Sequence, residues 1–313
     1  MEGVGNNMRY FKFLALTVVF VLALLPALVL RGQQRGETMV WAPKPIKGNP
    51  WVAPNKPHWK LSELLAMHKG QTSWKEPIVR DSLLQADYIQ MAPGTKSPRQ
   101  FHPDNRAWWI VQDGQVRFSI EGQEPILASK GFLVQVPYRN IYSLEVVGDK
   151  PALFLAVTAG EAQTMYPADE TPVPIPGFEF VKVRVSGKGN YDEINKPFFD
   201  FNTMVAGQRG QPRFVVDDRL FANIIRGMPQ ADNPKDKGHF HEVSAEFWFV
   251  LEGKIEYKIE GLETFVADQG DVVYVPKQLW HRAHHAGTGY STRLAMNGYP
   301  DMLHNYQPNE ELR

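Results

Sequence analysis

Short apolar runs, bounded by glycine, proline and polar turn residues, recur along the chain. Residues 247–251 and 272–275 are so uniformly apolar that they read as strands buried on both faces. The turn Glu252-Gly253 closes the first run, and Pro276, which cannot donate to a β-ladder, stops the second. Shorter runs at three further places are also expected to be strands: residues 178–185, 214–216 and 221–225.

Helical periodicity is scarce by comparison. The best helix candidate is residues 61–68, with Ser62 near its start and Gly70 just past its end. The pattern therefore predicts an all-β protein. A closed or sandwiched jelly roll is the architecture that hides so many apolar strands without leaving exposed sheet edges.

The strand pattern occurs twice, with a constant shift of 139 positions and no gap. Five matched pairs show the repeat: Phe101-His102 with Phe240-His241, Trp109 with Trp248, Gly114 with Gly253, Gly131 with Gly270, and Pro137 with Pro276. A tandem duplication is the economical explanation. The length of 313 residues also suits two domains of about 150 residues.

These observations divide the chain into four parts. Residues 1–36 form a leader, and residues 37–165 form a first barrel with an extended N-terminal arm. Residues 166–177 are rich in proline and form a semi-rigid linker, which residues 178–313 follow as the second barrel.

The second copy carries a concentrated set of metal-binding residue types: His239, His241, Glu246 and His281. Because alternate side chains of a strand share a face, His239 and His241 are expected to present both imidazoles to one ion. Three imidazoles and one carboxylate suit a hard or borderline metal ion with coordination positions left open for chemistry.

These residues, with their flanking glycines and Pro276, resemble the two motifs of the cupin superfamily. The first motif is matched by His239-x-His241, Glu246 and Gly253, and the second by Gly270, Pro276 and His281; Gln278 stands where the second motif usually has glycine. The resemblance implies two tandem cupin jelly-roll (double-stranded β-helix) barrels, with His239, His241, Glu246 and His281 as metal ligands.

The first copy lacks three of the four ligands. His239, Glu246 and His281 correspond to Gln100, Ala107 and Tyr142, so that only His102 remains. We therefore expect the N-terminal barrel to be structural, with His102 hydrogen-bonded in a former site. A small organic ligand in that cavity, lined by Gln100, His102, Trp109 and Tyr142, is a second possibility.

Candidate catalytic groups around the metal are Arg226, Arg293 and His284. The two arginines are candidates to bind an anionic substrate, whereas Arg282 should point away from its neighbour His281. His284 and His285 are candidates for acid and base groups or for an additional ligand, because imidazole titrates near neutral pH.

Aromatic residues and a polar loop complete the expected surroundings of the metal. Trp248 should share the inward face of Glu246, and four further aromatic residues could line a pocket for a planar substrate: Phe240, Tyr257, Tyr274 and Trp280. The polar loop 229–238 is a candidate lid that could deliver the carboxylate of Asp232 or Asp236.

Amino-acid composition argues against two classes of function, thiol catalysis and nucleic-acid binding. The absence of cysteine excludes thiol catalysis and disulfide bonds, and the net charge of zero gives no sign of a nucleic-acid partner. The resemblance implies an enzyme that contains one divalent transition metal, with manganese, iron or copper first and nickel or zinc as further choices.

Three functions remain open. The first is an oxidoreductase of the dioxygenase or oxidase type that acts on a small phenolic or carboxylic substrate. The second is a metal-dependent decarboxylase or isomerase, and the third is a non-catalytic ligand or metal binder. Cupins commonly pair, so a homo-oligomer is also implied.

The N-terminus favours export. Arg9 and Lys12 precede an apolar segment at residues 13–30, and Arg31 ends it. Such a segment is either a secretory signal or a short membrane anchor, and the sequence leaves the choice open.

Overall fold

A computed structural model describes residues 38–204, 213–216, 219–298 and 304–313. The chain divides into two units, residues 1–43 and residues 44–313. Residues 38–43 have no helix or strand, and the expected signal or anchor at residues 13–30 lies outside the described part of the chain. No helix within the described ranges is long and apolar enough to cross a membrane.

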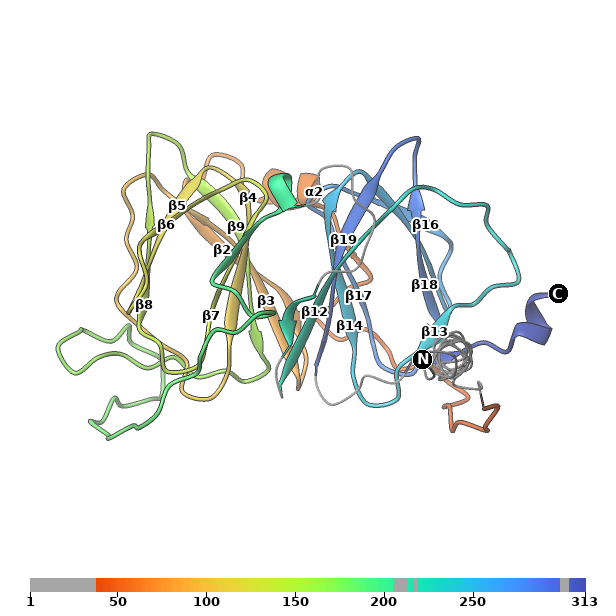
Figure 1. The fold of residues 1–313 in the computed structure, drawn as a ribbon, viewed down its shortest axis with the longest axis horizontal. Helices are drawn as coiled ribbons and strands as arrows, with labels where there is room; N and C mark the ends of the chain where they lie inside the picture. Colours follow the sequence, from red (N-terminus) through yellow and green to blue (C-terminus); the bar gives the residue numbers. More distant parts are fainter. Residues whose placement is uncertain (1–37, 205–212, 217–218, 299–303) are drawn as a thin grey trace, which may run out of the picture. The chain divides into compact units, whose positions relative to one another are not determined.

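The regular secondary structure of the described chain consists almost entirely of strands, as the sequence predicts (Figure 1). The first barrel consists of a six-stranded sheet in the order β10-β7-β4-β9-β3-β2 and a three-stranded sheet in the order β6-β5-β8. Its strands are β2 (Trp74–Arg80), β3 (Leu84–Met91), β4 (Ala107–Asp113), β5 (Gln115–Ile120), β6 (Ile126–Ser129), β7 (Phe132–Val136), β8 (Tyr142–Val146), β9 (Ala152–Ala159) and β10 (Phe198–Asp200).

The second barrel repeats this arrangement. Its sheets run β1-β17-β14-β19-β12-β11 and β16-β15-β18-β13-β20. The strands are β1 (His58–Trp59), β11 (Arg213–Val216), β12 (Leu220–Gly227), β13 (His239–Phe240), β14 (Glu246–Glu252), β15 (Lys254–Ile259), β16 (Phe265–Asp268), β17 (Val272–Val275), β18 (His281–Ala286), β19 (Ser291–Gly298) and β20 (Asn305–Tyr306).

The duplication is confirmed strand by strand. Four strand pairs keep the shift of 139 residues at both ends: β4 with β14, β5 with β15, β6 with β16 and β9 with β19. The glycines that follow β4 and β14 repeat as well: Gly114 and Gly253 have φ values of 74° and 67°. A Cβ atom there would lie 2.5 Å from the carbonyl oxygen of Pro151 and 2.7 Å from that of Tyr290, so both turns require glycine.

The two barrels exchange short strands. β1, which precedes the first barrel in sequence, pairs with β17 of the second barrel, and β10, which precedes the second barrel, pairs with β7 of the first. The arm that leads to β1 also contacts the second barrel, where Trp51 Nε1 donates to the carbonyl oxygen of Tyr274 at 3.0 Å. The predicted boundaries at residues 165 and 178 stay predictions, but these hydrogen bonds cross them.

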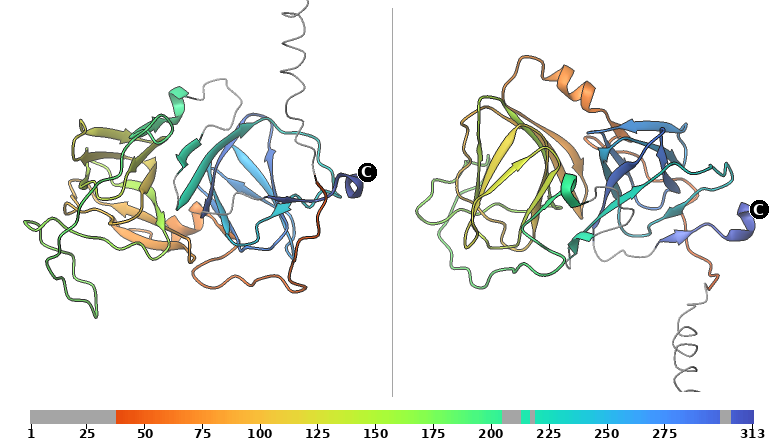
Figure 2. Two further views of the ribbon diagram at one scale, coloured as in Figure 1. Left: turned by 60° about the horizontal axis from the view of Figure 1, so that its bottom comes forward. Right: turned by 45° about the horizontal axis from the view of Figure 1, so that its top comes forward.

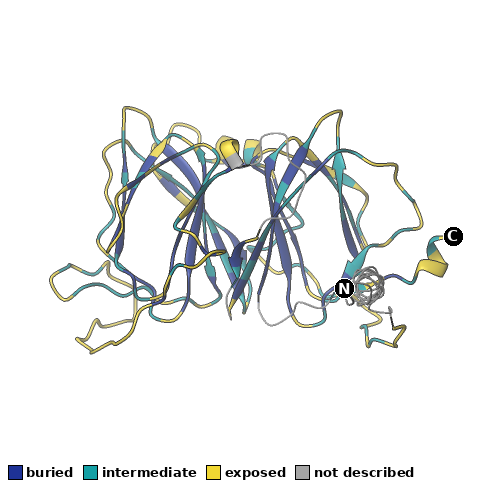
Figure 3. Ribbon diagram, in the orientation of Figure 1, coloured by how far each residue is buried: buried dark blue, intermediate teal, exposed yellow. Residues whose placement is uncertain are grey.

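The large sheets of the two barrels pack on each other through one shared core. Strand β14 shows how the sequence permits this: Phe247, Phe249 and Leu251 belong to the shared core, whereas Trp248 and Val250 belong to the interior of the second barrel. Burial on both faces explains why this strand is uniformly apolar instead of alternating (Figure 3). The views in Figure 2 agree that the barrels lie side by side.

The finer predictions of secondary structure have mixed outcomes. The helix is confirmed as α2 (Leu61–Met67), a second short helix is α3 (Phe201–Met204), and the chain ends in the 3-10 helix Asn309–Leu312. The strands expected at residues 214–216 and 221–225 are confirmed as parts of β11 and β12.

The prediction of a strand at residues 178–185 is wrong. This segment is extended and exposed, and no described strand pairs with it. The side chains of Phe178 and Val181 are 69% and 68% exposed, so the apolar pattern of the segment is not used for burial within the described chain. A segment becomes a strand only where the edge of a sheet is available to pair with it, and an alternating pattern alone does not provide such an edge.

Candidate metal centre

The four residues of the expected site lie together at one end of the second barrel. His239 is in β13, Glu246 begins β14 and His281 begins β18, while His241 follows β13. An antiparallel bridge pairs His239 directly with His281. Gly238 permits this close approach, because a Cβ atom at its φ of +80° would lie 2.0 Å from the carbonyl oxygen of His281.

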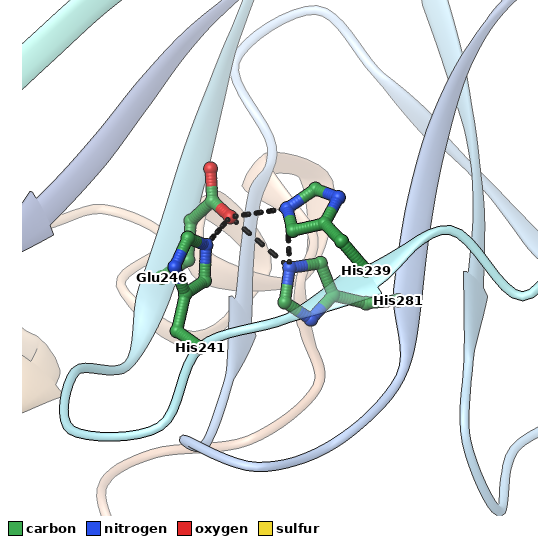
Figure 4. A group of neighbouring side chains, drawn as sticks. All are labelled: His239, His241, Glu246 and His281. Atoms are coloured by element: carbon green, nitrogen blue, oxygen red, sulfur yellow. Dashed lines mark hydrogen bonds and ion pairs between the residues drawn. The ribbon is translucent and has the colours of Figure 1, made fainter. Parts of the chain in front are cut away.

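One carboxylate oxygen of Glu246 is the centre of the cluster (Figure 4). Its Oε2 atom lies 3.0 Å from Nε2 of His241, 3.1 Å from Nε2 of His281 and 3.6 Å from Nε2 of His239. The Nε2 atoms of His239 and His281 are 3.2 Å apart. Each of the four side chains therefore directs one ligand atom to the same point.

The cluster is buried and holds a negative charge. His241, Glu246 and His281 are at most 5% exposed, and His239 at 19% is the most accessible member. Burial raises the pKa of Glu246, but the three imidazoles around its carboxylate outweigh this effect and hold the pKa well below its usual range. Burial lowers the pKa of His239, which keeps its imidazole neutral and able to bind a cation.

The donor set fits a transition metal. Metal bonds to imidazole nitrogen and carboxylate oxygen are about 2.0–2.2 Å long. Two ligand atoms whose bonds to the ion form a right angle are therefore about 3 Å apart. The separations of 3.0, 3.1 and 3.2 Å in the cluster match that value. Nδ1 of His281 lies 2.8 Å from the carbonyl oxygen of Leu279; the Nδ1–H tautomer donates this hydrogen bond and leaves the Nε2 lone pair directed into the cluster.

The described C-terminal segment adds residues that sequence reasoning missed. The ring of His304 lies 4.6 Å from the rings of both His239 and His241, and it stacks on Tyr306. β20 holds this segment against β13, with Tyr306 paired to His239. Because His304 belongs to neither motif, only the pairing of β20 with β13 reveals it.

Asn297 is a second missed neighbour. Its Nδ2 lies 3.5 Å from Nε2 of His241, and its position on β19 pairs with Glu246 of β14. Alternation along β19 could have placed it on the inward face, but only the strand pairing shows that it lies at the level of the cluster.

The three candidate catalytic residues have different positions. Arg226 is on the outer face of its sheet, where its Nε lies 3.0 Å from Oε2 of Glu252 and its guanidinium covers the ring of Tyr290. His284 is paired with Glu256 on the outer face of β18, and its Nδ1 lies 3.5 Å from Asp232. These placements argue against direct roles for Arg226 and His284 at the cluster, whereas Arg293 faces the barrel interior opposite Val250.

The loop 229–238 is fixed to the outside of the barrel. Arg282, which points away from the cluster as expected, binds Asp232 and Asp236 and donates hydrogen bonds to the carbonyl oxygens of Asn233 and Asp236 at 2.9 and 3.1 Å. Both aspartates are therefore engaged away from the metal site, in contrast to the expected lid. Asp232, Glu256 and His284 form a second group of residue types that bind metals, in which Asp232 is exposed and the other two are half-buried. Such groups of acidic residues are common at protein surfaces where no ion binds.

His285 does not reach the cluster either. Its Nδ1 lies 2.8 Å from Oγ of Ser291, and its ring packs against Gly227 at the end of β12. Burial, with the neighbouring charge of Arg293, lowers its pKa to about 4. It is a neutral interior group at the far end of β18 from His281 and not an additional ligand.

Two of the five expected aromatic residues line the barrel interior. Trp248 lies with its ring 5.4 Å from His281 and 5.2 Å from Tyr257, which is also inside the barrel. Tyr274 belongs instead to the core between the barrels, and Phe240 packs on Trp280, with their ring centroids 4.9 Å apart. The reason is alternation: Phe240 and Tyr274 are each one position away from an inward-facing residue.

The corresponding place in the first barrel is closed by its own hydrogen bonds. Gln100 and Tyr142 form the same bridge as His239 and His281. The Tyr142 hydroxyl accepts a hydrogen bond from Nε2 of Gln100 at 3.1 Å and donates one to Nε2 of His102 at 3.1 Å. Nδ1 of His102 then donates to the carbonyl oxygen of Gln163 at 2.9 Å, which supports the prediction of a hydrogen-bonded histidine in a former site.

Comparisons with known proteins agree with this architecture. A family model described as a cupin domain matches residues 87–158 and 229–296. No curated protein sequence matches the chain. The solved structures that resemble it include salicylate 1,2-dioxygenase from Pseudaminobacter salicylatoxidans, with 17% identity, a TM-score of 0.58, and coverage of 88% of this chain and 92% of that chain.

Two further structures show the same likeness. A structure of salicylate 1,2-dioxygenase from the same organism with gentisate adducts has 16% identity and a TM-score of 0.55, covering 77% of this chain and 80% of that chain. A cupin 2 conserved barrel domain protein from Leptotrichia buccalis has 13% identity and a TM-score of 0.53, covering 76% of this chain and 94% of that chain. At these identities the likeness concerns the fold.

Proposed function

Because the chain is a bicupin, a two-barrel member of the cupin superfamily, we propose that its second barrel holds the active site of a metal-dependent oxidoreductase. The reaction is of the dioxygenase or oxidase type, and the substrate is a small phenolic or carboxylic compound. The observation that carries this proposal is the convergence of three imidazoles and one carboxylate in a buried barrel end.

The metal is a divalent transition ion held by His239, His241, Glu246 and His281. Manganese, iron and copper are the first choices, and nickel and zinc are further ones, because imidazole and carboxylate ligands suit all of these ions. When bound, such an ion supplies open positions where substrate and dioxygen meet and the redox change that the reaction needs.

The residues of the chain hold this site in place. The carbonyl oxygen of Leu279 orients His281, and Asn297 lies beside His241. Trp248 fills the space next to His281 and limits the water around it, while His304 and Tyr306 cover the more accessible ligand His239. The apolar surroundings strengthen electrostatic interactions within the cluster.

The substrate class rests on the ligand set and on analogy. Salicylate 1,2-dioxygenase acts on an aromatic hydroxy acid, as its name states, and one of its structures contains gentisate. The shared fold makes such compounds the first substrates to test, while the low identity leaves the choice of substrate to this chain's own residues.

Export is the remaining part of the proposal. It is supported by Arg9 and Lys12 ahead of the apolar segment at residues 13–30. Fractionation of cells that express the full chain with a C-terminal tag tests it. Recovery with the cytoplasmic fraction would contradict export, and recovery with membranes or with the exported soluble fraction would distinguish an anchor from a cleaved signal.

Elemental analysis of the purified full-length chain, paired with oxygen uptake, tests the oxidoreductase. The compounds to test are salicylate, gentisate, catechols, flavonols and oxalate. Close to one redox-active ion per chain with oxygen uptake is expected. The same ion with no uptake would favour a decarboxylase, an isomerase or a binding protein, and a chain without metal would overturn the site.

A further inference from the structure

Arg293 and Tyr257 are two polar residues in the barrel interior with buried polar atoms that have no partner among the described residues. The Nε and Nη1 atoms of Arg293 are buried, and no described residue accepts a hydrogen bond from them. The hydroxyl of Tyr257, whose side chain is fully buried, has no partner in the described part of the chain either. Buried donors of this kind cost free energy unless something satisfies them, and a buried guanidinium costs more than a hydroxyl.

Both side chains occupy the interior that contains the metal ligands. On β19 the inward positions pair in turn with β14: Asn297 with Glu246, Ala295 with Trp248, and Arg293 with Val250. Tyr257 enters from β15 on the opposite sheet, and the ring of Trp248 lies between it and His281, 5.2 Å from the first and 5.4 Å from the second.

Electrostatics connect Arg293 to the cluster. Burial lowers the pKa of Arg293, while attraction to Tyr257 and Glu246 opposes this change. The nearby His285 is neutral because burial lowers its pKa to about 4. With a divalent ion bound to one carboxylate and three neutral imidazoles, and with Arg293 nearby, the interior carries a net positive charge, which an anionic ligand would reduce.

The first barrel shows that the fold does not require this pair. At the matching positions, 139 residues earlier, Phe154 replaces Arg293 and Phe118 replaces Tyr257. Both phenylalanines are buried in the core of a barrel that lacks three of the four metal ligands. The polar pair therefore occurs together with the metal ligands, as expected for a ligand-binding role and not for a packing role.

Two other arginines on strands of this barrel, Arg226 and Arg282, differ from Arg293 because each has an ion-pair partner. Arg226 binds Glu252, and Arg282 binds Asp232 and Asp236, all on outer faces of the barrel. Arg293 has no ion pair with any described carboxylate, which leaves its guanidinium available. Guanidinium groups bind carboxylates with two parallel hydrogen bonds, and a tyrosine hydroxyl can donate a third.

We propose that Arg293 and Tyr257 form a carboxylate-binding subsite, so that the substrate is a small aromatic acid with its acid group inside the barrel and its reacting end toward the cluster. This inference rests on the proposed function and specifies its substrate class. Arg293 and Asn297 are four residues apart on β19, about 13 Å between their Cα atoms, so the acid group lies away from the metal ligands.

Binding to the full-length protein loaded with zinc tests the subsite without turnover. The probes are 3,4-dihydroxybenzoate and its methyl ester, which lacks the charge of the acid group and carries one extra methyl group, and calorimetry gives both dissociation constants. Wild type should prefer the acid. Arg293→Met should weaken binding of the acid by about 10- to 100-fold and leave the ester unchanged, because a charge-assisted hydrogen bond is lost.

Three further variants separate binding from structure. Tyr257→Phe should weaken acid binding by about 10-fold or less, and Arg293→Lys should recover part of the loss. Arg226→Met, which removes an arginine from the outer face, should leave the ratio of acid to ester unchanged. Zinc content and thermal midpoint, measured for every variant, identify any that does not fold.

Two outcomes would overturn the subsite. One is wild-type protein that binds neither probe or shows no preference for the acid. The other is an Arg293→Met variant that folds and retains the wild-type ratio. Failure of the proposed function is distinguishable: absence of oxygen uptake with retained acid preference would remove the oxidoreductase and leave the carboxylate subsite.

Discussion

The two barrels place different side chains on the same backbone bridge. In the second barrel the bridge pairs His239 with His281, and in the first it pairs Gln100 with Tyr142. The centre of the second cluster is the Glu246 carboxylate, and the centre of the first is the Tyr142 hydroxyl. The backbone is thus compatible with a cation site in either barrel, and the side chains decide whether one exists.

The two barrels also differ in how they satisfy their buried polar groups. At the place that corresponds to the cluster, the first barrel satisfies its polar groups internally: Gln100, Tyr142, His102 and the carbonyl oxygen of Gln163 form one hydrogen-bonded chain. The second barrel brings together imidazole nitrogens and carboxylate oxygens, whose lone pairs repel one another unless a cation lies among them. It also contains Arg293 and Tyr257, whose buried polar atoms have no described partner.

Removal of a ligand should have the largest effect. Either His241→Ala or Glu246→Ala should reduce the metal content from about one ion per chain to near zero, because the remaining donors cannot complete the coordination. The matched variant His102→Ala should leave metal content unchanged. Elemental analysis of the three purified proteins is the measurement, and equal metal loss from His102→Ala would contradict the difference between the barrels.

Restoring the ligands to the first barrel should have the next largest effect. Gln100→His, Ala107→Glu and Tyr142→His, combined with the native His102, should add up to one further ion per chain, because the bridge geometry is the same in both barrels. The control keeps Ala107 and carries the two histidine substitutions only. A folded triple variant with no additional metal would show that the surrounding residues also decide.

Loss of the central hydroxyl in the first barrel should have a moderate effect on stability. Tyr142→Phe leaves the buried Nε2 of His102 and the amide of Gln100 without their partner, which should cost about 1–3 kcal/mol of unfolding free energy. Denaturant titration measures this change. Metal content should not change, and a variant as stable as wild type would show that the hydrogen-bonded chain contributes little.

The smallest expected effect is the contribution of His102 to the loss of folding stability at acid pH. Burial lowers the pKa of His102, so the unfolded chain, with an ordinary value near 6.5, binds a proton that the folded state refuses. Stability is therefore lost as pH falls below about 6.5, by at most about 1.4 kcal/mol per pH unit. His102→Gln should remove this part of the slope between pH 7 and pH 5.5, and an unchanged slope would contradict it.

Much of the fold and the cluster could be predicted because the signals are local. Gly114 and Gly253 each close a tight turn that no larger residue fits, so the constant shift between them reveals the duplication. His239 and His241 lie beside a turn and a bridge that the flanking glycines specify. Alternation along β14 also correctly places Trp248 on the face of Glu246.

Other features depend on contacts between distant segments. Strands buried on both faces carry no sign of which face is the barrel interior, so Arg226 and Arg293 look alike in sequence, although one lies outside and the other inside. Tyr274 was expected near the substrate for the same reason, and it belongs to the core between the barrels.

The duplication, the jelly-roll class and the four converging ligands could all be predicted from residue pattern, because turn glycines and strand alternation act within a few residues. Three features become visible only in the folded chain: which arginine enters the barrel, the exchange of β1 and β10 between the barrels, and the position of His304 over the ligands. Each of these depends on strand pairing between segments far apart in sequence, which residue pattern does not encode.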